Sequence, residues 1–350
     1  MVGKSRGHNP VLLTGEVYWW RGMVTLFNNF EYLVSSWYAL IPSYKLKKKE
    51  AQSVTLLDRK ITLYRGEDNK VRALNARCSH MGADLGRGCV IGNQLRCAFH
   101  HWRFGDDGRC THIPSMDEIP AFASTFSYPC QEKFGFIWIF NGERPTFALP
   151  AFEAWKMEEL QHIALPASRL NCHPHLISSN GLDIEHMKTL HNMTFVEEPQ
   201  VERLDHYRIQ TRFKIAIQGN GFRERVIKAT LGELIRLHLT TWGGNMAVGE
   251  VMHRKNPVLI IFAHNPRIDR TSVCRGFVFL PKINRWGLKA NYLKLPQVFA
   301  ALHYILHADH DVLNHIKFHP HLVESDRAIK LFMDQMNNMD YFPKTDKAAV

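Results

Sequence analysis

Short runs of apolar and polar residues, separated by turn-forming residues, fill the chain from residue 36 to residue 145. The runs are rich in β-branched and aromatic residues, which favour strands, and Gly, Asp and Asn stand between them. The predicted strands are Ser53–Leu57, Ile61–Tyr64, Val71–Leu74 and Phe134–Phe140. This pattern predicts a small antiparallel β domain over residues 36–145, with a boundary at Pro145–Pro150.

Longer segments of both kinds follow over residues 146–340. Three segments have a helical pattern: Trp155–Gln161, Asn180–Met193, and a region from Val298 to Met336 that is broken at Pro320. Between them lie four strand-like runs, Arg208–Ile217, Leu234–Trp242, Val258–Ala263 and Val273–Leu280. A block of strands flanked by helices predicts an α+β domain built on an antiparallel sheet. No internal repeat and no low-complexity segment is visible.

The first 35 residues differ from both domains. An apolar stretch from Val17 to Ile41 contains polar interruptions at Arg21, Asn28, Asn29 and Glu31, so it does not suit a bilayer span. Its apolar residues recur at helical spacing: Met23, Leu26, Phe27, Phe30, Leu33, Val34 and Trp37. We therefore expect an amphipathic helical segment packed on the body of the protein. Met1–Pro10 is polar and does not resemble a signal peptide, so a cytoplasmic protein without membrane contact is expected.

Composition and charge narrow the class of partner. The 350 residues are 45% apolar and 22% charged, which suits an ordinary globular protein of two domains. A formal net charge of +11 indicates an acidic partner. Apart from Lys45–Lys49 the basic residues are scattered, so a nucleic-acid-binding protein is not expected. An acidic redox protein that docks by charge attraction fits the candidate chemistry better.

That chemistry begins with two similar loops. Cys78-Ser79-His80 is followed after sixteen residues by Cys97-Ala98-Phe99-His100. One Cys and one His on each of two loops is the ligand set of a Rieske [2Fe–2S] cluster, in which two thiolates hold one iron and two imidazoles the other. Cys78, His80, Cys97 and His100 are therefore the candidate cluster ligands. Glycines follow both loops, and Trp102 and Phe104 offer apolar cover.

Two Cys and two His also suit a tetrahedral zinc site. Zinc fingers usually pair Cys with Cys and His with His, whereas each loop here carries one of each, which favours the Rieske interpretation. The five other cysteines show no paired spacing and are expected to be reduced thiols. They are Cys89, Cys110, Cys130, Cys172 and Cys274.

A second group of metal-binding residue types lies in Asn180-x2-Asp183-x2-His186-x4-His191. Two imidazoles and one carboxylate on one face of an iron, with the other positions open, form the triad of non-haem Fe(II) oxygenases. Five residues at about 100° each put His186 and His191 some 140° apart on an ideal helix. A helix end or a π-bulge between them is therefore needed if both bind one metal. The alternative is a helix with two surface or capping histidines.

With these motifs the chain resembles the Rieske non-haem iron oxygenases, from Trp37 to about Met336. The matching blocks are Cys78-x-His80 with Cys97-x2-His100, Gly108-Arg109-Cys110-x-His112-Ile113-Pro114, and Asn180 to His191. Most members have Gly after the fourth ligand, and this chain has His101. That variant is similar to the subgroup of 3-ketosteroid 9α-hydroxylase oxygenases and the arylamine oxygenase of pyrrolnitrin synthesis.

The resemblance implies an Asp as third iron ligand, and His307–Leu313 offers Asp309 and Asp311. We favour Asp311, because Asp311-Val312 followed by Pro320 matches the subgroup. The more usual family pattern, an Asp three residues before Val or Ile, would select Asp309. His315 departs from the steroid enzymes, which have Trp at that position.

The resemblance also implies a terminal oxygenase with a helix-grip (START-like) catalytic domain, a [2Fe–2S] cluster, a mononuclear Fe(II), and O₂ as co-substrate. Electrons would come from NAD(P)H through a reductase or ferredoxin. A head-to-tail homotrimer would bring the cluster of one subunit beside the iron of the next, with Asp183 bridging His186 and a cluster histidine, His100. Asn180 would lie near the iron.

Two other classes of protein remain: an electron carrier with a Rieske cluster and no oxygenase chemistry, and a zinc-binding interaction protein. Substrate identity and the reaction outcome are not encoded in these motifs. By analogy with the subgroup we expect a medium-sized apolar or aromatic substrate. The candidate pocket walls are Phe195, Phe213, Leu234, Leu239, Trp242, Phe262 and Phe279.

Overall fold

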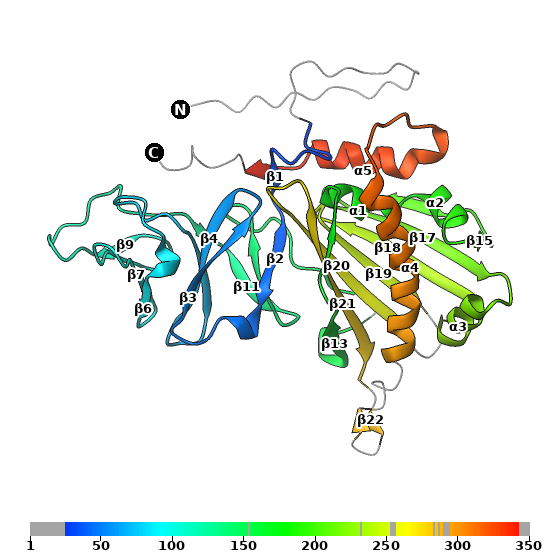
Figure 1. Cartoon of the computed structure of the whole chain (residues 1–350), viewed down its shortest axis with the longest axis horizontal. Coiled ribbons are helices and arrows are strands. Elements are labelled where there is room, and N and C mark those ends of the chain that lie inside the picture. Colours follow the sequence, from blue (N-terminus) through cyan, green and yellow to red (C-terminus); the bar gives the residue numbers. More distant parts are fainter. Residues whose placement is uncertain are drawn as a thin grey trace.

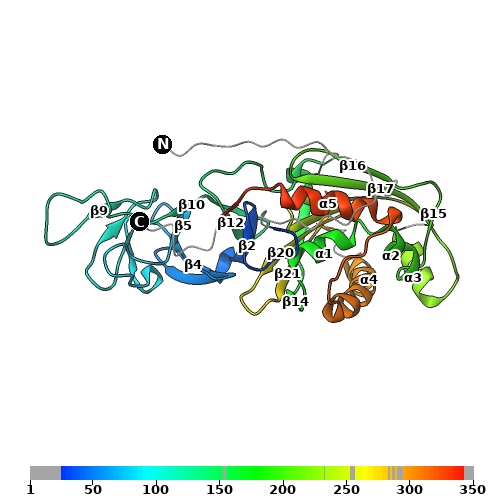
Figure 2. The same ribbon diagram turned by 90° about the horizontal axis from the view of Figure 1, so that it is seen from above.

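The structure is a computed structural model that describes residues 25–152, 155–231, 233–252, 257–282, 284–285, 288–289 and 295–342. Two β-rich bodies lie side by side and give an elongated molecule (Figures 1 and 2). The smaller body holds the chain from β2 to β12, and the larger body holds the long sheet and the helices. No helix in these described ranges is long and apolar enough to cross a membrane.

The smaller body contains three antiparallel sheets. The first has the order β11-β12-β2, the second β10-β5-β4-β3, and the third β6-β7-β8-β9. Their strands are β2 (Trp37–Pro42), β3 (Ala51–Leu56), β4 (Arg59–Arg65), β5 (Val71–Asn75), β6 (Cys89–Ile91), β7 (Gln94–Arg96), β8 (Arg103–Phe104), β9 (Cys110–His112), β10 (Ser127–Tyr128), β11 (Cys130–Lys133) and β12 (Phe136–Phe140). The third sheet forms one end of the molecule (Figure 1).

The larger body is built on a nine-stranded antiparallel sheet of order β13-β21-β20-β19-β18-β17-β15. β14 (Ser168–Leu170) pairs with β21, and β16 (Gln200–Arg203) pairs with β17. The other strands are β13 (Leu160–Ala164), β15 (Met193–Phe195), β17 (Arg208–Ile217), β18 (Leu234–Trp242), β19 (Met246–Met252), β20 (Val258–Pro266) and β21 (Ser272–Pro281). Small pairs are β1 (Leu33–Val34) with β24 (Tyr341–Phe342), and β22 (Asn284–Arg285) with β23 (Leu288–Lys289).

Within the described ranges five α-helices accompany this sheet, and α4 crosses its face with α1 and α2 beside its C-terminal half (Figures 1 and 2). They are α1 (Pro174–Asn180), α2 (Ile184–Thr189), α3 (Phe222–Leu231), α4 (Leu295–His315) and α5 (Arg327–Asn337). Short 3₁₀ turns occupy Ser43–Lys45, Leu85–Arg87, Met157–Glu159 and Glu324–Asp326. Sheet and helices together confirm the predicted α+β class.

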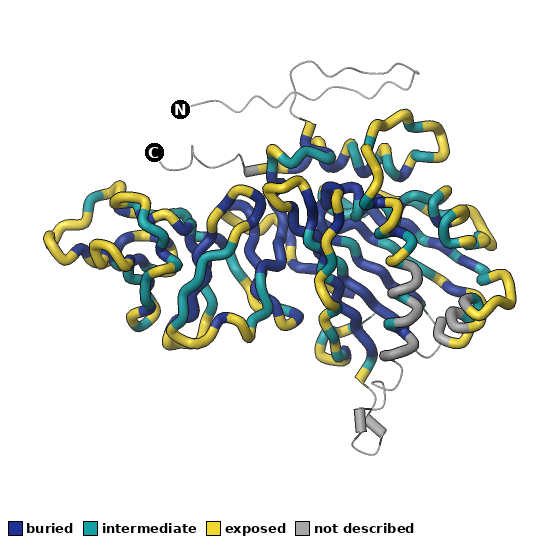
Figure 3. Tube along the Cα trace, viewed as in Figure 1, coloured by how far each residue is buried: buried dark blue, intermediate teal, exposed yellow. Residues whose placement is uncertain are grey.

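The two bodies share one aromatic core. The ring of Phe136 in β12 meets the edge of Phe277 in β21 at 5.2 Å between centroids, and Phe134 meets Phe279 at 5.0 Å. Trp138 is fully buried in the same cluster. The most deeply buried chain lies in the strands where the bodies meet (Figure 3). Because edge-to-face aromatic pairs add to the apolar area they bury, this contact holds the bodies in one orientation.

The predicted strands Ser53–Leu57, Ile61–Tyr64, Val71–Leu74 and Phe134–Phe140 coincide with β3, β4, β5 and β12. In the larger body the four predicted strands coincide with β17, β18, β20 and β21. The predicted helical region Val298–Met336 consists of two helices, α4 and α5. As predicted, the loop between them includes Pro320. β19 and α3 were not predicted.

Two predicted helices are wrong. Trp155–Gln161 forms a 3₁₀ turn that leads into β13, where pairing with β21 overrides the local helical preference. Residues 1–24 of the N-terminal segment lie outside the described residues, and residues 25–41 contain β1 and the start of β2 instead of a helix. The backbone N–H groups of Leu26 and Phe27 both donate to Asn337 Oδ1 at 3.0 Å, so tertiary contacts hold this stretch in a non-helical conformation.

Two buried histidines hold the same stretch and make the stability of the protein sensitive to acid. The N–H of Asn28 donates to His175 Nδ1 at 3.2 Å, and the N–H of His175 donates to His173 Nδ1 at 3.1 Å. Burial lowers the pKa of His175 from 6.5 to about 3, and it lowers the pKa of His173 well below 6.5. The unfolded chain therefore binds more protons than the native protein between pH 6.5 and pH 3.

We expect the free energy of unfolding to fall as the pH drops through this window. His175 alone accounts for about 2 kcal/mol between pH 7 and pH 5, since one pKa unit corresponds to about 1.4 kcal/mol. Urea unfolding at the two pH values measures the loss. His175→Gln should reduce it, and an unchanged pH dependence in that variant would contradict this explanation.

Candidate cluster loops and metal centre

The two Cys/His loops lie at the tip of the small body. The first follows β5, and the second connects β7 to β8. His80 Nδ1 and His100 Nδ1 face each other at 3.1 Å, and the two thiols lie below them, 4% exposed at Cys78 and 1% exposed at Cys97. The fold therefore brings together all four residues that the sequence singled out.

The local environment suits a metal cluster. The pKa of the Cys78 thiol is raised to about 12, mainly by burial and also by the neighbouring Cys97, although the backbone N–H of His80 points to the Cys78 sulfur and favours its thiolate. Two buried thiolates side by side need a cation, and two facing imidazole nitrogens offer it a second pair of ligands. The donor set thus fits a [2Fe–2S] cluster with Cys on one iron and His on the other.

Aromatic side chains hold and surround this tip. The His80 ring stacks on Trp102 with centroids 4.6 Å apart and planes 7° apart, so its orientation is fixed. Trp102 is buried with Leu85, Leu95 and Phe104 in a small core below the loops. Gly108 closes the neighbouring turn with φ of +81°, and a Cβ there would lie 2.0 Å from the Thr125 carbonyl oxygen, so only glycine fits.

His101 explains why glycine is common directly after the fourth ligand. Its φ is +60°, in the left-handed region that costs a non-glycine residue about 1–2 kcal/mol, and its side chain is exposed. We expect His101→Gly to raise the free energy of unfolding by about 1 kcal/mol after the larger entropy of the unfolded glycine chain is subtracted. Denaturant unfolding measures the change.

His112→Gly is the matched control, because His112 is also exposed but lies in β9 with an ordinary φ. That variant should be destabilised. A loss of stability in both variants would show that the left-handed conformation at His101 carries no cost.

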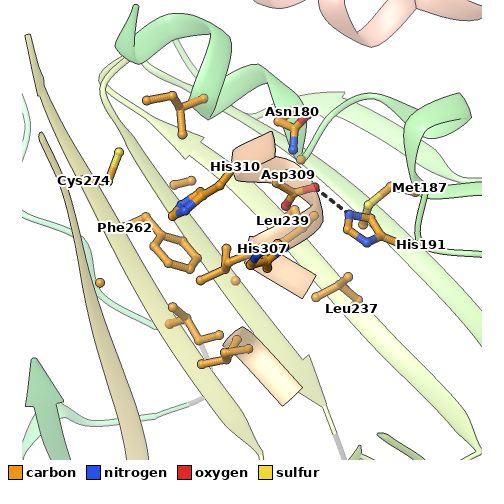
Figure 4. A pocket seen from close by; sticks show the side chains of 18 of the residues that line it. Asn180, Met187, His191, Leu237, Leu239, Phe262, Cys274, His307, Asp309 and His310 are labelled. Atoms are coloured by element: carbon orange, nitrogen blue, oxygen red, sulfur yellow. Dashed lines mark ion pairs between the residues drawn. The ribbon is translucent and has the colours of Figure 1, made fainter. Parts of the chain in front are cut away.

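The second group of residues meets at the sheet face between α2 and α4. His186 Nε2 and His191 Nε2 each lie 2.9 Å from Asp309 Oδ1, and the three ligand atoms lie within 4.8 Å of one another. All three side chains are nearly buried. Figure 4 shows Asp309 from α4 and His191 pointing toward each other at the wall of a cavity.

Three possible metal-ligand atoms converge at this point, one from each side chain. His186 Nδ1 lies 3.2 Å from the carbonyl oxygen of Asn180, which can only accept, so Nδ1 carries the proton and Nε2 presents its lone pair. A carboxylate and an imidazole lone pair at 2.9 Å repel unless a cation lies between them, so the site fits a divalent metal ion.

The backbone of α2 explains how two histidines five residues apart reach one point. Asp183 is the N-cap of α2, and its Oδ1 accepts from the N–H of His186 at 2.9 Å. The helix then ends at Thr189, and His191 follows in the turn behind Leu190. The expected helix end between the histidines is therefore present.

Asp311 does not join this group, and the structure corrects our preference for it. Its side chain is 76% exposed and its nearest charged neighbour is His315 at 3.8 Å, whereas the Asp309 side chain is 12% exposed and faces both histidines. Two helix positions two residues apart differ by about 200°, so only one of them can face the sheet. Asp309 lines the cavity on one helical stripe of α4 with Leu302, Leu306 and Leu313, whereas Asp311 does not line it.

A cavity of about 1010 Å³ opens from the three residues along the sheet. Its wall is mostly aliphatic and comes from β17 to β21, α1, α2 and α4. Asn180 lines it beside His186, whereas Asp183 is not among the lining residues. Of the predicted wall residues, Leu239 and Phe262 line the cavity; the other five, Phe195, Phe213, Leu234, Trp242 and Phe279, do not.

Sequence comparison identifies the small body. The model of the Rieske [2Fe-2S] domain matches residues 36–123. Among curated proteins, cholesterol 7-desaturase of Ciona intestinalis is 33% identical over 161 residues, 45% of this chain and 34% of the relative. Aminopyrrolnitrin oxygenase of Pseudomonas fluorescens is 32% identical over 130 residues, 35% of this chain and 36% of the relative. The chain carries a Rieske domain and is homologous to Rieske oxygenases.

The predicted resemblance is thereby confirmed. The matched part of this Rieske oxygenase homologue spans about a third of the length of the curated relatives. The fold extends further: dicamba monooxygenase bound to 3,6-dichlorosalicylic acid superposes with a TM-score of 0.67 at 18% identity, covering 89% of this chain and 98% of that one. The architecture of both bodies is therefore that of a known Rieske oxygenase structure.

Proposed function

We propose that this chain is a terminal oxygenase component that oxidises an apolar substrate at a mononuclear iron. Cys78, His80, Cys97 and His100 would hold the [2Fe–2S] cluster. His186, His191 and Asp309 would hold the iron. The observation that carries the proposal is the convergence of two imidazoles and one carboxylate at the wall of a large apolar cavity, in a chain that also has the cluster loops.

The chain's own groups prepare this site. When bound, the cluster supplies single electrons and the iron supplies dioxygen activation. Asn180 fixes the tautomer of His186 through its carbonyl oxygen, and the Asp183 cap fixes the start of the helix that carries His186. The aliphatic walls keep water away from the triad and hold an apolar molecule against it.

Cavity size and lining support a substrate of sterol size. About 1010 Å³ is at the upper end of the usual range for ligand pockets, and the wall is largely aliphatic. One relative is named for its action on cholesterol, which is a molecule of this size and polarity. We therefore propose a large, mostly apolar substrate. Hydroxylation, N-oxygenation, desaturation and demethylation all remain within this proposal.

The shape of the chain bears on its assembly. The cluster loops adjoin β5, β7 and β8 in the small body, whereas the three converging residues come from α2, the turn behind it and α4 in the larger body (Figure 1). Electron transfer within one chain would have to cross both bodies, whereas a head-to-tail ring places the tip of one subunit against the next subunit's triad. We therefore propose a homotrimer. A reductase or ferredoxin with an acidic docking face would supply the electrons, in keeping with a net charge of +11.

Turnover with a surrogate reductase tests the proposal. NAD(P)H, reductase, O₂ and a panel of sterols and aromatic compounds are incubated with the purified protein, and the products are identified by mass spectrometry. We expect an oxidised product whose formation depends on substrate, O₂ and protein together. Cluster reoxidation at the same rate with and without every panel member, and no product, would favour an electron carrier without oxygenase chemistry.

A further inference from the structure

One histidine in the cavity wall has a buried ring nitrogen without a hydrogen-bond partner among the described residues. His264 lies in β20, is 3% exposed, and lines the cavity. Its Nδ1 is buried and has no hydrogen-bond partner among the described residues. Figure 4 shows the surrounding wall at Phe262 and Cys274, with His310 of α4 projecting toward it. A buried imidazole nitrogen that makes no hydrogen bond is unusual in a folded protein.

A second unpaired polar atom belongs to the same wall. Ser178 lies in α1, which packs on β20, and its hydroxyl oxygen is buried without a partner. Ser178 also lines the cavity. Each buried polar group left unpaired costs about 1–3 kcal/mol, so both are expected to have a partner in the working state of the protein.

Arg275 is the third lining residue with an unpaired buried atom, and it belongs to a different contact. Its Nη2 donates to the Leu40 carbonyl oxygen at 3.0 Å, and its guanidinium lies 5.8 Å from the centre of the Phe136 ring. Both partners are in the small body, so Arg275 serves the contact between the bodies.

The neutral charge and the hydrogen-bonding capacity of His264 and Ser178 indicate which chemical group of a ligand they bind. Burial, together with His310, lowers the pKa of His264 to about 3, so its imidazole is neutral in neutral solution. A neutral imidazole and a hydroxyl can each donate or accept one hydrogen bond but offer no charge to a carboxylate or a phosphate. Phe262 and Ile260 of the same strand add apolar wall on the same side of the cavity.

We propose that His264 and Ser178 form a polar subsite that hydrogen-bonds one neutral hydroxyl or carbonyl group of an otherwise apolar substrate. The inference rests on the proposed function in taking the cavity as the substrate site. A hydroxyl would donate to the free lone pair of His264 and accept from Ser178, and a carbonyl would accept from both. Either would satisfy the two buried groups and fix which carbon of the ligand faces His186, His191 and Asp309. His264 is thus a substrate-positioning residue.

Binding of matched ligand pairs tests this subsite. The probes are cholesterol with cholest-5-ene, and 1-naphthol with naphthalene, where the members of each pair differ by one hydroxyl. Equilibrium dissociation constants are measured by fluorescence titration for the parent, His264→Phe and Ser178→Ala. We expect the parent to bind the hydroxylated member of at least one pair about tenfold more tightly or better. His264→Phe should abolish that preference, and Ser178→Ala should reduce it.

His162→Phe is the matched control. His162 is an exposed imidazole in β13 that faces Phe134 and Phe279 and does not line the cavity, so its loss should leave the preference unchanged. Circular dichroism confirms that each variant is folded, and Ser178→Ala decides the matter if His264→Phe does not fold.

Three results would overturn the subsite: an unchanged preference in both subsite variants, no preference in the parent for either pair, or no binding of either pair. Turnover of the same preparations separates this inference from the proposed function. A parent that shows the hydroxyl preference but forms no product supports the subsite and contradicts the oxygenase. A parent that forms product without the hydroxyl preference supports the oxygenase and contradicts the subsite.

Discussion

Asp309→Ala is expected to empty the mononuclear iron site while the cluster remains. Asp309 supplies the only carboxylate within reach of His186 and His191 among the described residues, and two neutral imidazoles alone hold Fe(II) poorly. Iron should fall by about one atom per chain, and turnover should fall by about 100-fold or more. Metal analysis, the visible spectrum of the cluster and a turnover assay measure the three quantities.

Asp311→Ala is the matched control for this variant. Asp311 lies two residues away on the same helix with an exposed side chain, so its loss removes one carboxylate and spares the three converging residues. Iron content and turnover should stay close to those of the parent. If Asp311→Ala empties the site and Asp309→Ala does not, the arrangement of α4 described above is wrong.

The second large effect is expected at Asp183. The family resemblance implies that its carboxylate bridges His186 and a cluster histidine of the neighbouring subunit, and the fold adds that it caps α2. Asn caps helices about as well as Asp, so Asp183→Asn removes the charge and keeps the cap. We expect both iron centres to remain loaded and turnover to fall roughly 100-fold, because the oriented hydrogen bond to the histidines is lost.

Asp183→Ala separates the two roles. It removes cap and charge together, and it should lower the free energy of unfolding by about 1 kcal/mol beyond the effect of Asp183→Asn. Rapid-mixing measurements of cluster oxidation, started by O₂ and substrate, report electron transfer directly. Turnover of Asp183→Asn within a few-fold of the parent would mean that Asp183 acts only as a cap, and the bridge between subunits would have to be abandoned.

Sequence patterns predicted the strands better than the helices. β17, β18, β20 and β21 are long and rich in β-branched residues, so their period and composition agree. β19 contains Gly249 and Met residues and lacks that signal, and α3 has a weakly amphipathic, charged sequence. The stretch from Leu26 to Trp37 has helical spacing of apolar residues, yet contacts with α5 and α1 hold it in turns and a short strand. Tertiary contacts of that kind leave no trace in a local pattern.

The site was predictable to the level of residue types and failed at one position. The Cys/His loops and the His186–His191 pair lie close in sequence, so their spacing carries the signal. The third ligand lies more than 110 residues further on, and family alignment alone chose between two carboxylates. A physical signal was present: Asp309 continues the apolar stripe of Leu302, Leu306 and Leu313, and Asp311 does not. His264 had no local motif, because its significance comes only from the cavity around it.

Iron and sulfide analysis of the purified protein, combined with electron paramagnetic resonance of the reduced form, tests the central claim most directly. Two metal centres in one chain predict about three iron atoms and two acid-labile sulfides per chain, with a Rieske-type signal. Replacing His80 or His100 by Cys should shift or destroy that signal. About two iron atoms per chain would leave an electron carrier without a mononuclear site. A colourless, zinc-loaded protein after anaerobic purification would contradict the whole account.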